Sequence, residues 1–231
     1  PGAPAPANDD FAAQELNQFL WAQNVDFPFQ FAFRAELEGR AGGNPSWTTG
    51  VDFTTQLAHS ADRDEVIALY HQAGLNLHAD LATLQTTAPI AADPGAVSYL
   101  ERFITYTGDL NMPVLTMHTI GDGLVIHEDE RAYADVVHAA GDTSLLRQIW
   151  VNRAGHCAFT PAETITAFQT LIQRVNTGHW NDQPGDLNAS ATALGPAYNI
   201  LFVNGSVIAQ PPAFVRFEST VFPRPFDSRD E

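Results

Sequence analysis

The order of apolar and polar positions is most regular in the middle of the chain. Residues 113–118 are mostly apolar and lead into Gly-Asp-Gly, which predicts a buried strand ending in a turn. Residues 128–140 carry Ala, Val and Tyr at intervals of three and four positions, and their acidic first turn suits the positive end of a helix dipole, so they predict a helix. A second apolar run at 145–151 predicts another strand, with residues 152–155 as a turn.

A second helix is expected directly after this turn. Thr160, Pro161 and Glu163 have the spacing of a helix N-cap, a first-turn proline and the reciprocal acid of a capping box. Strand, helix, strand and helix in this order predict two parallel strands joined by a right-handed crossover, and therefore an α/β fold. The apolar residues that share one face of the second helix are Ile165, Phe168, Ile172 and Val175.

The stretch before this region, residues 1–109, predicts mainly helix. It is rich in Phe, Ala and Gln, and a helix is expected over residues 62–86 with a break near Gly74. Aromatic residues alternate with others at 27–33, a pattern that fits a strand, but Pro28 restricts such a strand to a sheet edge or a loop.

Composition divides the chain into three stretches, 1–109, 110–178 and 179–231. The last is expected to be a loop-rich extension with short strands at 200–203 and 214–217. No repeat at a fixed period marks any of the three.

The charge balance excludes two classes of partner. Asp and Glu number 27 against 11 basic residues, all of them Arg, which gives a formal net charge of -16. Such a surface repels phosphate backbones and anionic lipids, so neither nucleic acid nor a membrane is an expected partner. No apolar run approaches the roughly 20 residues that cross a bilayer. The opening residues, 1–10, resemble a processed end or a linker and contain no signal peptide.

Two of the expected loops carry the residue types of an acid–base pair. Asp122 follows the first strand and His156 follows the second. Parallel strands end at the same edge of a sheet, where α/β enzymes place their sites, so the two loops are expected to be neighbours. A buried carboxylate beside a histidine fixes its tautomer and stabilises the imidazolium. We therefore predict Asp122 and His156 as acid and general base; the competing interpretations are an ordinary Gly-Asp-Gly turn and a turn histidine.

Other polar residues near these loops have simpler expected roles. Asp129 and Glu130 are alternative acids, but they fall inside the expected helix rather than in the loop. His118 is expected to pack in the core or to donate to the site. The motifs H-E-x-x-H, G-x-G-x-x-G and G-x-x-x-x-G-K-[ST] do not occur, so no metal and no cofactor is expected.

The segment MPVLTMHTIGDGLVIHEDERAYADVV, followed by LLRQIWVNRAGHCAFTPAETITAF, resembles the last third of an α/β-hydrolase. In that family the catalytic acid lies in the loop after the seventh strand and the histidine in the loop after the eighth. The resemblance therefore implies catalytic roles for Asp122 and His156. It also implies that residues 1–109 are a cap, that 110–178 form the carboxyl-terminal part of the core, and that 179–231 pack on that core.

The serine that this family uses as nucleophile has no counterpart in the sequence. In the family the serine precedes the acid and the histidine and lies in a G-x-S-x-G turn, which does not occur here. The nearest candidates, Ser46, Ser98 and Ser206, lack the preceding strand or the second glycine. We therefore expect a missing N-terminal segment, or a companion chain from a cleaved precursor, to complete the sheet and supply the serine, giving a heterodimer.

The single cysteine, Cys157, directly follows His156. In the tannase and fungal feruloyl esterase group, cysteines beside the catalytic serine and histidine are joined by a disulfide. Similarity to that group implies the same bond between Cys157 and the companion chain, and with it a secreted protein. The alternative is that Cys157 is a small buried hydrophobic residue.

The function expected from these features is a serine carboxylic-ester hydrolase. Phe27, Phe29, Phe31 and Trp47 are the candidates for lining an acyl or aryl site beneath the cap, although such aromatics can equally form ordinary core. A serine peptidase of the prolyl-oligopeptidase type and a non-catalytic binding chain are the alternative functions.

Overall fold

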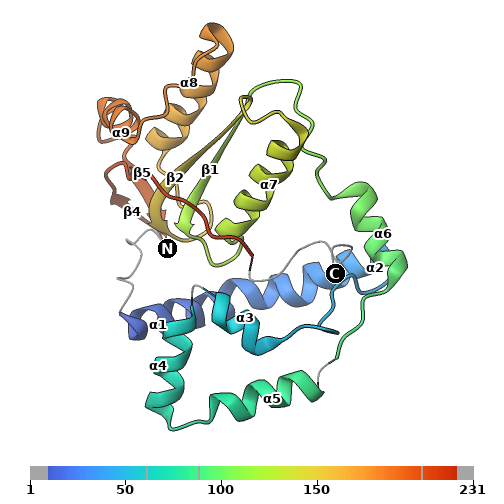
Figure 1. The fold of residues 1–231 in the computed structure, drawn as a ribbon. Coiled ribbons are helices and arrows are strands. Elements are labelled where there is room, and N and C mark those ends of the chain that lie inside the picture. The colour runs from blue at the N-terminus through green and yellow to red at the C-terminus, as the bar shows by residue number, and fades with distance from the viewer. Residues whose placement is uncertain (1–9, 61, 88, 204, 223–231) are drawn as a thin grey trace. The chain divides into compact units, whose positions relative to one another are not determined.

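The computed structural model describes residues 10–60, 62–87, 89–203 and 205–222 (Figure 1). These residues form two compact units that meet in sequence between Thr105 and Tyr106. The expected processed end or linker lies, except for its last residue, outside the described residues. Among the helices that the described residues form, none combines the length and the apolar character needed to cross a membrane.

The unit that ends at Thr105 is helical. The chain is helical throughout residues 11–41, where two wider π turns separate two α-helices. The predicted helix with a break near Gly74 is confirmed, because α4 ends at Ala73 and Gly74 caps it with a positive φ of 66°. The elements of this unit are α1 (Phe11–Trp21), η1 (Ala22–Asp26), η2 (Phe29–Phe33), α2 (Arg34–Ala41), α3 (Phe53–His59), α4 (Arg63–Ala73), α5 (Leu77–Thr87) and α6 (Pro94–Phe103).

The strand or loop expected at residues 27–33 is wrong, because these residues are helical. Phenylalanines at every second position also satisfy a spacing of four, which brings side chains together on a helix. The rings of Phe27 and Phe31 lie 4.5 Å apart, as do those of Phe29 and Phe33. Pro28 cannot donate a backbone hydrogen bond, and it lies between the two π turns, where the regular ladder is already interrupted.

The second unit, Tyr106–Val221, is mixed α/β. Strands β1 (Val114–Gly121) and β2 (Leu146–Ala154) are parallel, and the helix α7 (His127–Ala140) connects them, as predicted. Strand β5 (Phe214–Val215) pairs antiparallel with β2 and completes a sheet of order β1-β2-β5. The remaining elements are α8 (Pro161–Thr177), α9 (Pro184–Ala193) and the hairpin of β3 (Ile200–Val203) and β4 (Ser206–Ala209).

Side chains alternate between the two faces of β1 and β2. On one face, Met117, Ile149 and Val151 pack into a core with residues of α8, α9 and β5. On the other face, Gln148 donates to Glu130 of α7, and Trp150 packs edge-on against His118. Figure 1 shows α7 on one side of the two strands and α8 on the other. The sheet is therefore covered on both faces, as is usual for parallel strands.

Strand β2 is longer than predicted. Residues 152–154, expected in a turn, continue the strand, and the chain turns only at Gly155. Arg153 lies in this added part of the strand and is buried, where an unpaired charge would be costly. It is tolerated there because the buried Glu163 neutralises it.

The predicted capping box of α8 is confirmed by two reciprocal hydrogen bonds. The Glu163 backbone N–H donates to Thr160 Oγ1 at 3.1 Å, and the Thr160 N–H donates to the Glu163 carboxylate at 2.8 Å. The face of α8 that is buried carries small or short side chains, including Ala162, Thr166 and Ala167. Three members of the predicted apolar face remain exposed, and these are Phe168 (64% exposed), Ile172 (44%) and Val175 (64%).

The stretch after α8 contains more regular structure than expected. Helix α9 and strand β4 were not predicted, whereas the strand at 200–203 is confirmed. The strand expected at 214–217 is shorter and is limited to Phe214–Val215. Through β5 this stretch joins the main sheet.

Candidate active site

Asp122 directly follows β1, and its carboxylate is buried, with 3% of the side chain exposed. Its Oδ1 atom accepts hydrogen bonds from the backbone N–H groups of Leu124 (2.9 Å) and Val125 (3.1 Å). This local turn fixes the carboxylate and leaves Oδ2 directed at other residues. The Gly-Asp-Gly turn therefore holds the Asp122 side chain in one orientation.

His156 lies in the loop between β2 and α8, and its ring meets Asp122. The distance from His156 Nδ1 to Asp122 Oδ2 is 2.8 Å, which is a hydrogen bond. Whereas Asp122 is buried, 39% of the His156 side chain is exposed. The structure thus brings the two predicted residues together, with a buried carboxylate on Nδ1 and an accessible imidazole. Their catalytic roles remain predictions.

Hydrogen bonds at the ends of the strands hold the two loops together. The Gly155 N–H donates to the Gly121 carbonyl at 2.9 Å, and the buried Thr119 hydroxyl donates to the Gly155 carbonyl at 2.7 Å. A Cβ atom on Gly121 would stand 3.1 Å from the Cα atom of Ala154, which is closer than ordinary contact. Glycine at 121 therefore permits the close approach that puts Asp122 beside His156.

A buried ion pair between Arg153 and Glu163 holds the loop that carries His156 in place. Arg153, 2% exposed, ends the buried part of β2 and pairs with the fully buried Glu163 at 2.6 and 3.0 Å. The Arg153 guanidinium also donates to the carbonyls of Ala158 (2.7 Å) and Pro211 (3.0 Å), while Glu163 accepts from the Ala213 N–H (2.9 Å). These bonds tie both sides of the loop to the segment before β5.

Cys157 lies against the other nitrogen of the histidine. Its Sγ is 3.5 Å from His156 Nε2, within the range of a weak hydrogen bond to sulfur. The thiol is exposed, and its backbone φ of 51° is unusual for a residue other than glycine. Partial desolvation of the sulfur by its neighbours and the nearby Asp122 charge raise the pKa of the thiol, so the thiol form is favoured. As the only cysteine of the sequence it has no disulfide partner within this chain, and the predicted bond to a companion chain remains a prediction.

The alternative acids do not contact His156. Glu130 accepts hydrogen bonds from the Thr116 hydroxyl (2.6 Å) and the Gln148 amide (2.5 Å), on the α7 face of the sheet. His118 lies between Glu130 and Asp122, so its expected role as a donor near the site fits its position. Sequence reasoning did not identify Thr116, Gln148 or Arg153, whose importance depends on which strand positions lie opposite one another.

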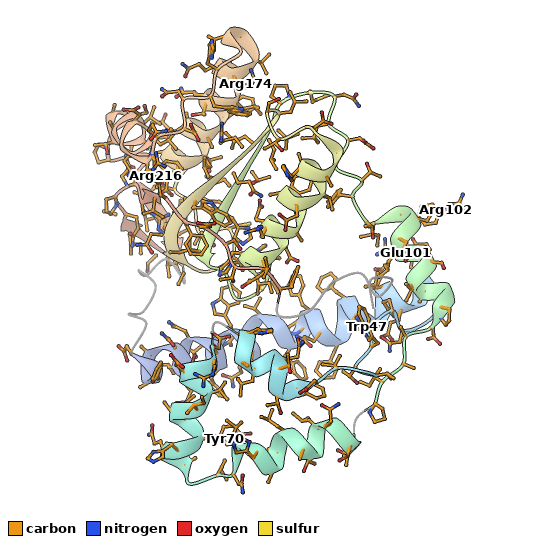
Figure 2. The ribbon with its side chains drawn as sticks, in the orientation of Figure 1. Trp47, Tyr70, Glu101, Arg102, Arg174 and Arg216 are labelled. Atoms are coloured by element: carbon orange, nitrogen blue, oxygen red, sulfur yellow. The ribbon has the colours of Figure 1, made fainter. Side chains whose placement is uncertain are left out.

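The predicted aromatic lining belongs to the helical unit. Phe27, Phe29 and Phe31 are exposed, at 61%, 43% and 65%, and their rings pair along the helix. Trp47 is half-buried and lies in the segment that connects α2 to α3 (Figure 2). A role for these four residues in substrate binding remains a prediction.

Comparison with known proteins gives one informative similarity. The sequence is 33% identical over 165 residues to the o-phthalyl amidase of Xanthobacter agilis. The alignment covers 69% of this chain but 36% of that protein, so the chain spans little more than a third of its relative's length. No protein-family model matches the sequence. No solved structure matches it significantly.

Proposed function

We propose that this chain is the acid–base part of a serine hydrolase that cleaves an ester or amide bond, with the serine carried on a segment outside this sequence. The observation that carries the proposal is the 2.8 Å hydrogen bond between the buried Asp122 carboxylate and the exposed His156 ring. A histidine held in this way accepts a proton on Nε2 and returns it to the leaving group.

The proposed reaction has two halves. The serine hydroxyl attacks the carbonyl carbon while His156 Nε2 takes its proton, and the proton then passes to the leaving alcohol or amine as the acyl–oxygen or acyl–nitrogen bond breaks. Water hydrolyses the acyl-enzyme in the same way, with His156 again as base. Asp122 stabilises the imidazolium formed in each half.

Two surfaces of the α/β unit support the proposal that a further segment, which carries the serine, packs against this unit. Strand β1 pairs only with β2 among the described residues, so its other edge has no strand partner there. The apolar side chains of Phe168, Ile172 and Val175 on α8 are exposed. The greater length of the amidase relative also supports a longer enzyme. We propose that this segment completes an α/β-hydrolase sheet, and that residues 1–109 form the cap of the completed hydrolase.

The tannase-like feature is part of the same proposal. Cys157 lies within 3.5 Å of the nitrogen that faces the serine, so a cysteine next to that serine would be near enough for a disulfide. Such a bond requires an oxidising compartment, and we therefore propose a secreted heterodimer. Because the relative is an o-phthalyl amidase, we extend the proposed substrate class to amides, including those of an o-phthalyl group.

Probe labelling of the protein from its natural source tests the nucleophile. A fluorophosphonate probe is expected to label a serine in a G-x-S-x-G peptide, and intact mass spectrometry before and after reduction is expected to show whether Cys157 joins two chains. No labelling together with a lone 25.1 kDa chain would contradict the proposal and favour a non-catalytic binding chain.

Variants test the residues of this chain. His156→Gln is expected to abolish hydrolysis of phthalyl esters and amides, whereas His138→Gln, which changes an exposed histidine in the last turn of α7, is the matched control. Full activity in His156→Gln would overturn the assignment. Hydrolysis of prolyl amides, without hydrolysis of phthalyl esters and amides, would instead favour a peptidase.

A further inference from the structure

His118 occupies a position between two carboxylates. It lies in β1, and its side chain is only 11% exposed. The His118 Nε2 atom is 3.0 Å from the Val125 carbonyl and 3.8 Å from Asp122 Oδ2, while Nδ1 is 3.6 Å from Glu130 Oε1. Both ring nitrogens therefore face oxygen acceptors. Because a neutral imidazole has only one N–H, this environment favours the doubly protonated cation.

The acceptor on the α7 side is itself held in place. Glu130 is 16% exposed and accepts from Thr116 and Gln148, which lie opposite each other on β1 and β2. Burial raises the pKa of Glu130, but the nearby His118 ring and the hydrogen bond from Thr116 outweigh it, so the pKa is lowered overall. Burial likewise lowers the pKa of His118, but the nearby Glu130 carboxylate, the hydrogen bond to the Val125 carbonyl and the Asp122 charge raise it overall.

We propose that His118, held as a cation by Glu130, is a positioning residue. It fixes the Asp122 carboxylate and reduces the degree to which Asp122 stabilises protonated His156. The inference rests on the proposed function, in which His156 is the base. The same oxygen, Asp122 Oδ2, faces both histidines, at 2.8 Å from His156 and 3.8 Å from His118. His118 places positive charge beside this buried carboxylate, and it does so as a member of β1 rather than of either site loop.

The positive charge of His118 also affects how strongly Asp122 stabilises protonated His156. Without a positive charge beside it, the Asp122 carboxylate would stabilise the imidazolium form of His156 more strongly, and the neutral base would be less available. With His118 positive, part of the Asp122 charge is neutralised. Loss of the cation is therefore expected to move the acid limb of the activity profile to higher pH.

The other groups that face His118 do not replace this pair. Asp129 of α7 is a third carboxylate, and burial raises its pKa, which favours its neutral form. Tyr106 and Tyr133 line a cavity of about 360 Å³ beside His118, together with Asp129 and Glu130. From β2, the edge of Trp150 packs on the ring at 5.9 Å and carries no charge. Glu130 and Asp122 are therefore the groups that govern the charge of His118.

The first experiment needs no activity. In the purified protein, NMR titration of the histidine rings follows His118 and His156 directly, each assigned by its loss in the Gln variant. Asp122→Asn and Glu130→Gln are each expected to move the His118 titration to lower pH. His118→Gln and Glu130→Gln are each expected to move the His156 titration to higher pH by at least roughly 0.3 pH unit, a factor of two in proton affinity.

The control is His138→Gln, which is expected to move neither titration. His156 titrations unchanged in both the His118→Gln and Glu130→Gln proteins, or moved to lower pH, would overturn the inference. Two variants are used because either substitution alone can perturb the fold, which circular dichroism would reveal.

The second experiment measures kcat/KM against pH in the active enzyme. The acid limb is expected to move to higher pH in His118→Gln and to stay in place in His138→Gln; an unmoved limb in His118→Gln would contradict the positioning role. If the titrations are coupled but no variant or wild-type protein hydrolyses any substrate, the proposed function fails while the coupling itself stands.

Discussion

Removing the charge of Glu163 tests how the histidine loop is supported. In Glu163→Gln the shape of the side chain is kept, but the Arg153 guanidinium, 2% exposed, loses its counter-charge. The amide can accept only through one atom, whereas the carboxylate uses both oxygens, one for the Thr160 N–H and one for the Ala213 N–H. One of these backbone groups, or Arg153 itself, would then face an N–H donor.

Because the pair is buried, we expect Glu163→Gln to lower the free energy of unfolding strongly. Breaking a buried ion pair by neutralising one partner costs about 3–5 kcal/mol, because the remaining charge stays buried. With a urea m-value of about 2–3 kcal/mol per molar, the unfolding midpoint would fall by about 1–2.5 M. Asp135→Asn is the matched control, since Asp135 pairs with Arg131 on the exposed face of α7, where such pairs contribute less than about 1 kcal/mol.

Urea unfolding followed by circular dichroism measures both variants. A midpoint in Glu163→Gln no lower than that of Asp135→Asn would refute the reasoning that Arg153 depends on Glu163. Hydrolytic activity should fall together with stability, because Arg153 and Glu163 lie on either side of the loop that carries His156.

Three other substitutions have defined outcomes. Asp122→Asn is expected to lower kcat by about 10³–10⁴-fold in steady-state kinetics, with the circular dichroism spectrum unchanged, because an amide does not stabilise the imidazolium; a loss below tenfold would argue against the acid. Thr160→Ala is expected to cost about 1–2 kcal/mol in urea unfolding, since the Glu163 N–H loses its acceptor. Burial and the Asp62 charge raise the pKa of the buried Glu65, whose Oε1 has no partner among the described residues, so stability falls as pH rises through its titration. Glu65→Gln is therefore expected to be about 1 kcal/mol more stable than wild type at neutral pH and no more stable in acid; equal thermal midpoints at neutral pH would contradict this.

The sequence was informative where two independent signals agreed. Periodicity and an acidic first turn together predicted α7, and the capping residues predicted the start of α8. The meeting of Asp122 and His156 followed from topology, because parallel strands bring their carboxyl ends to one edge. These features depend on short-range patterns and on the order of elements, both of which a single sequence contains.

Features that depend on packing partners were not predictable in this way. The aromatic alternation at 27–33 fits two periods, and only the surrounding helix decides between them. The turn predicted at 152–155 is strand as far as Ala154, because Arg153 can be buried only with Glu163, ten residues later, as its partner. Likewise, the apolar residues of α8 predicted its amphipathic character, but small residues on another face form the contact with the sheet. The position of His118 between Glu130 and Asp122 could not be predicted, because it depends on how α7 packs against β1.

The crowding at Gly121 has a consequence for protein engineering. Because the Gly155 amide bonds directly to the Gly121 carbonyl, and an added methyl group at 121 would push Ala154 away, a change in the acid loop is expected to shift the histidine loop as well. A graft that aims to change specificity should transfer both loops as a single cassette, together with the strand ends that hold them.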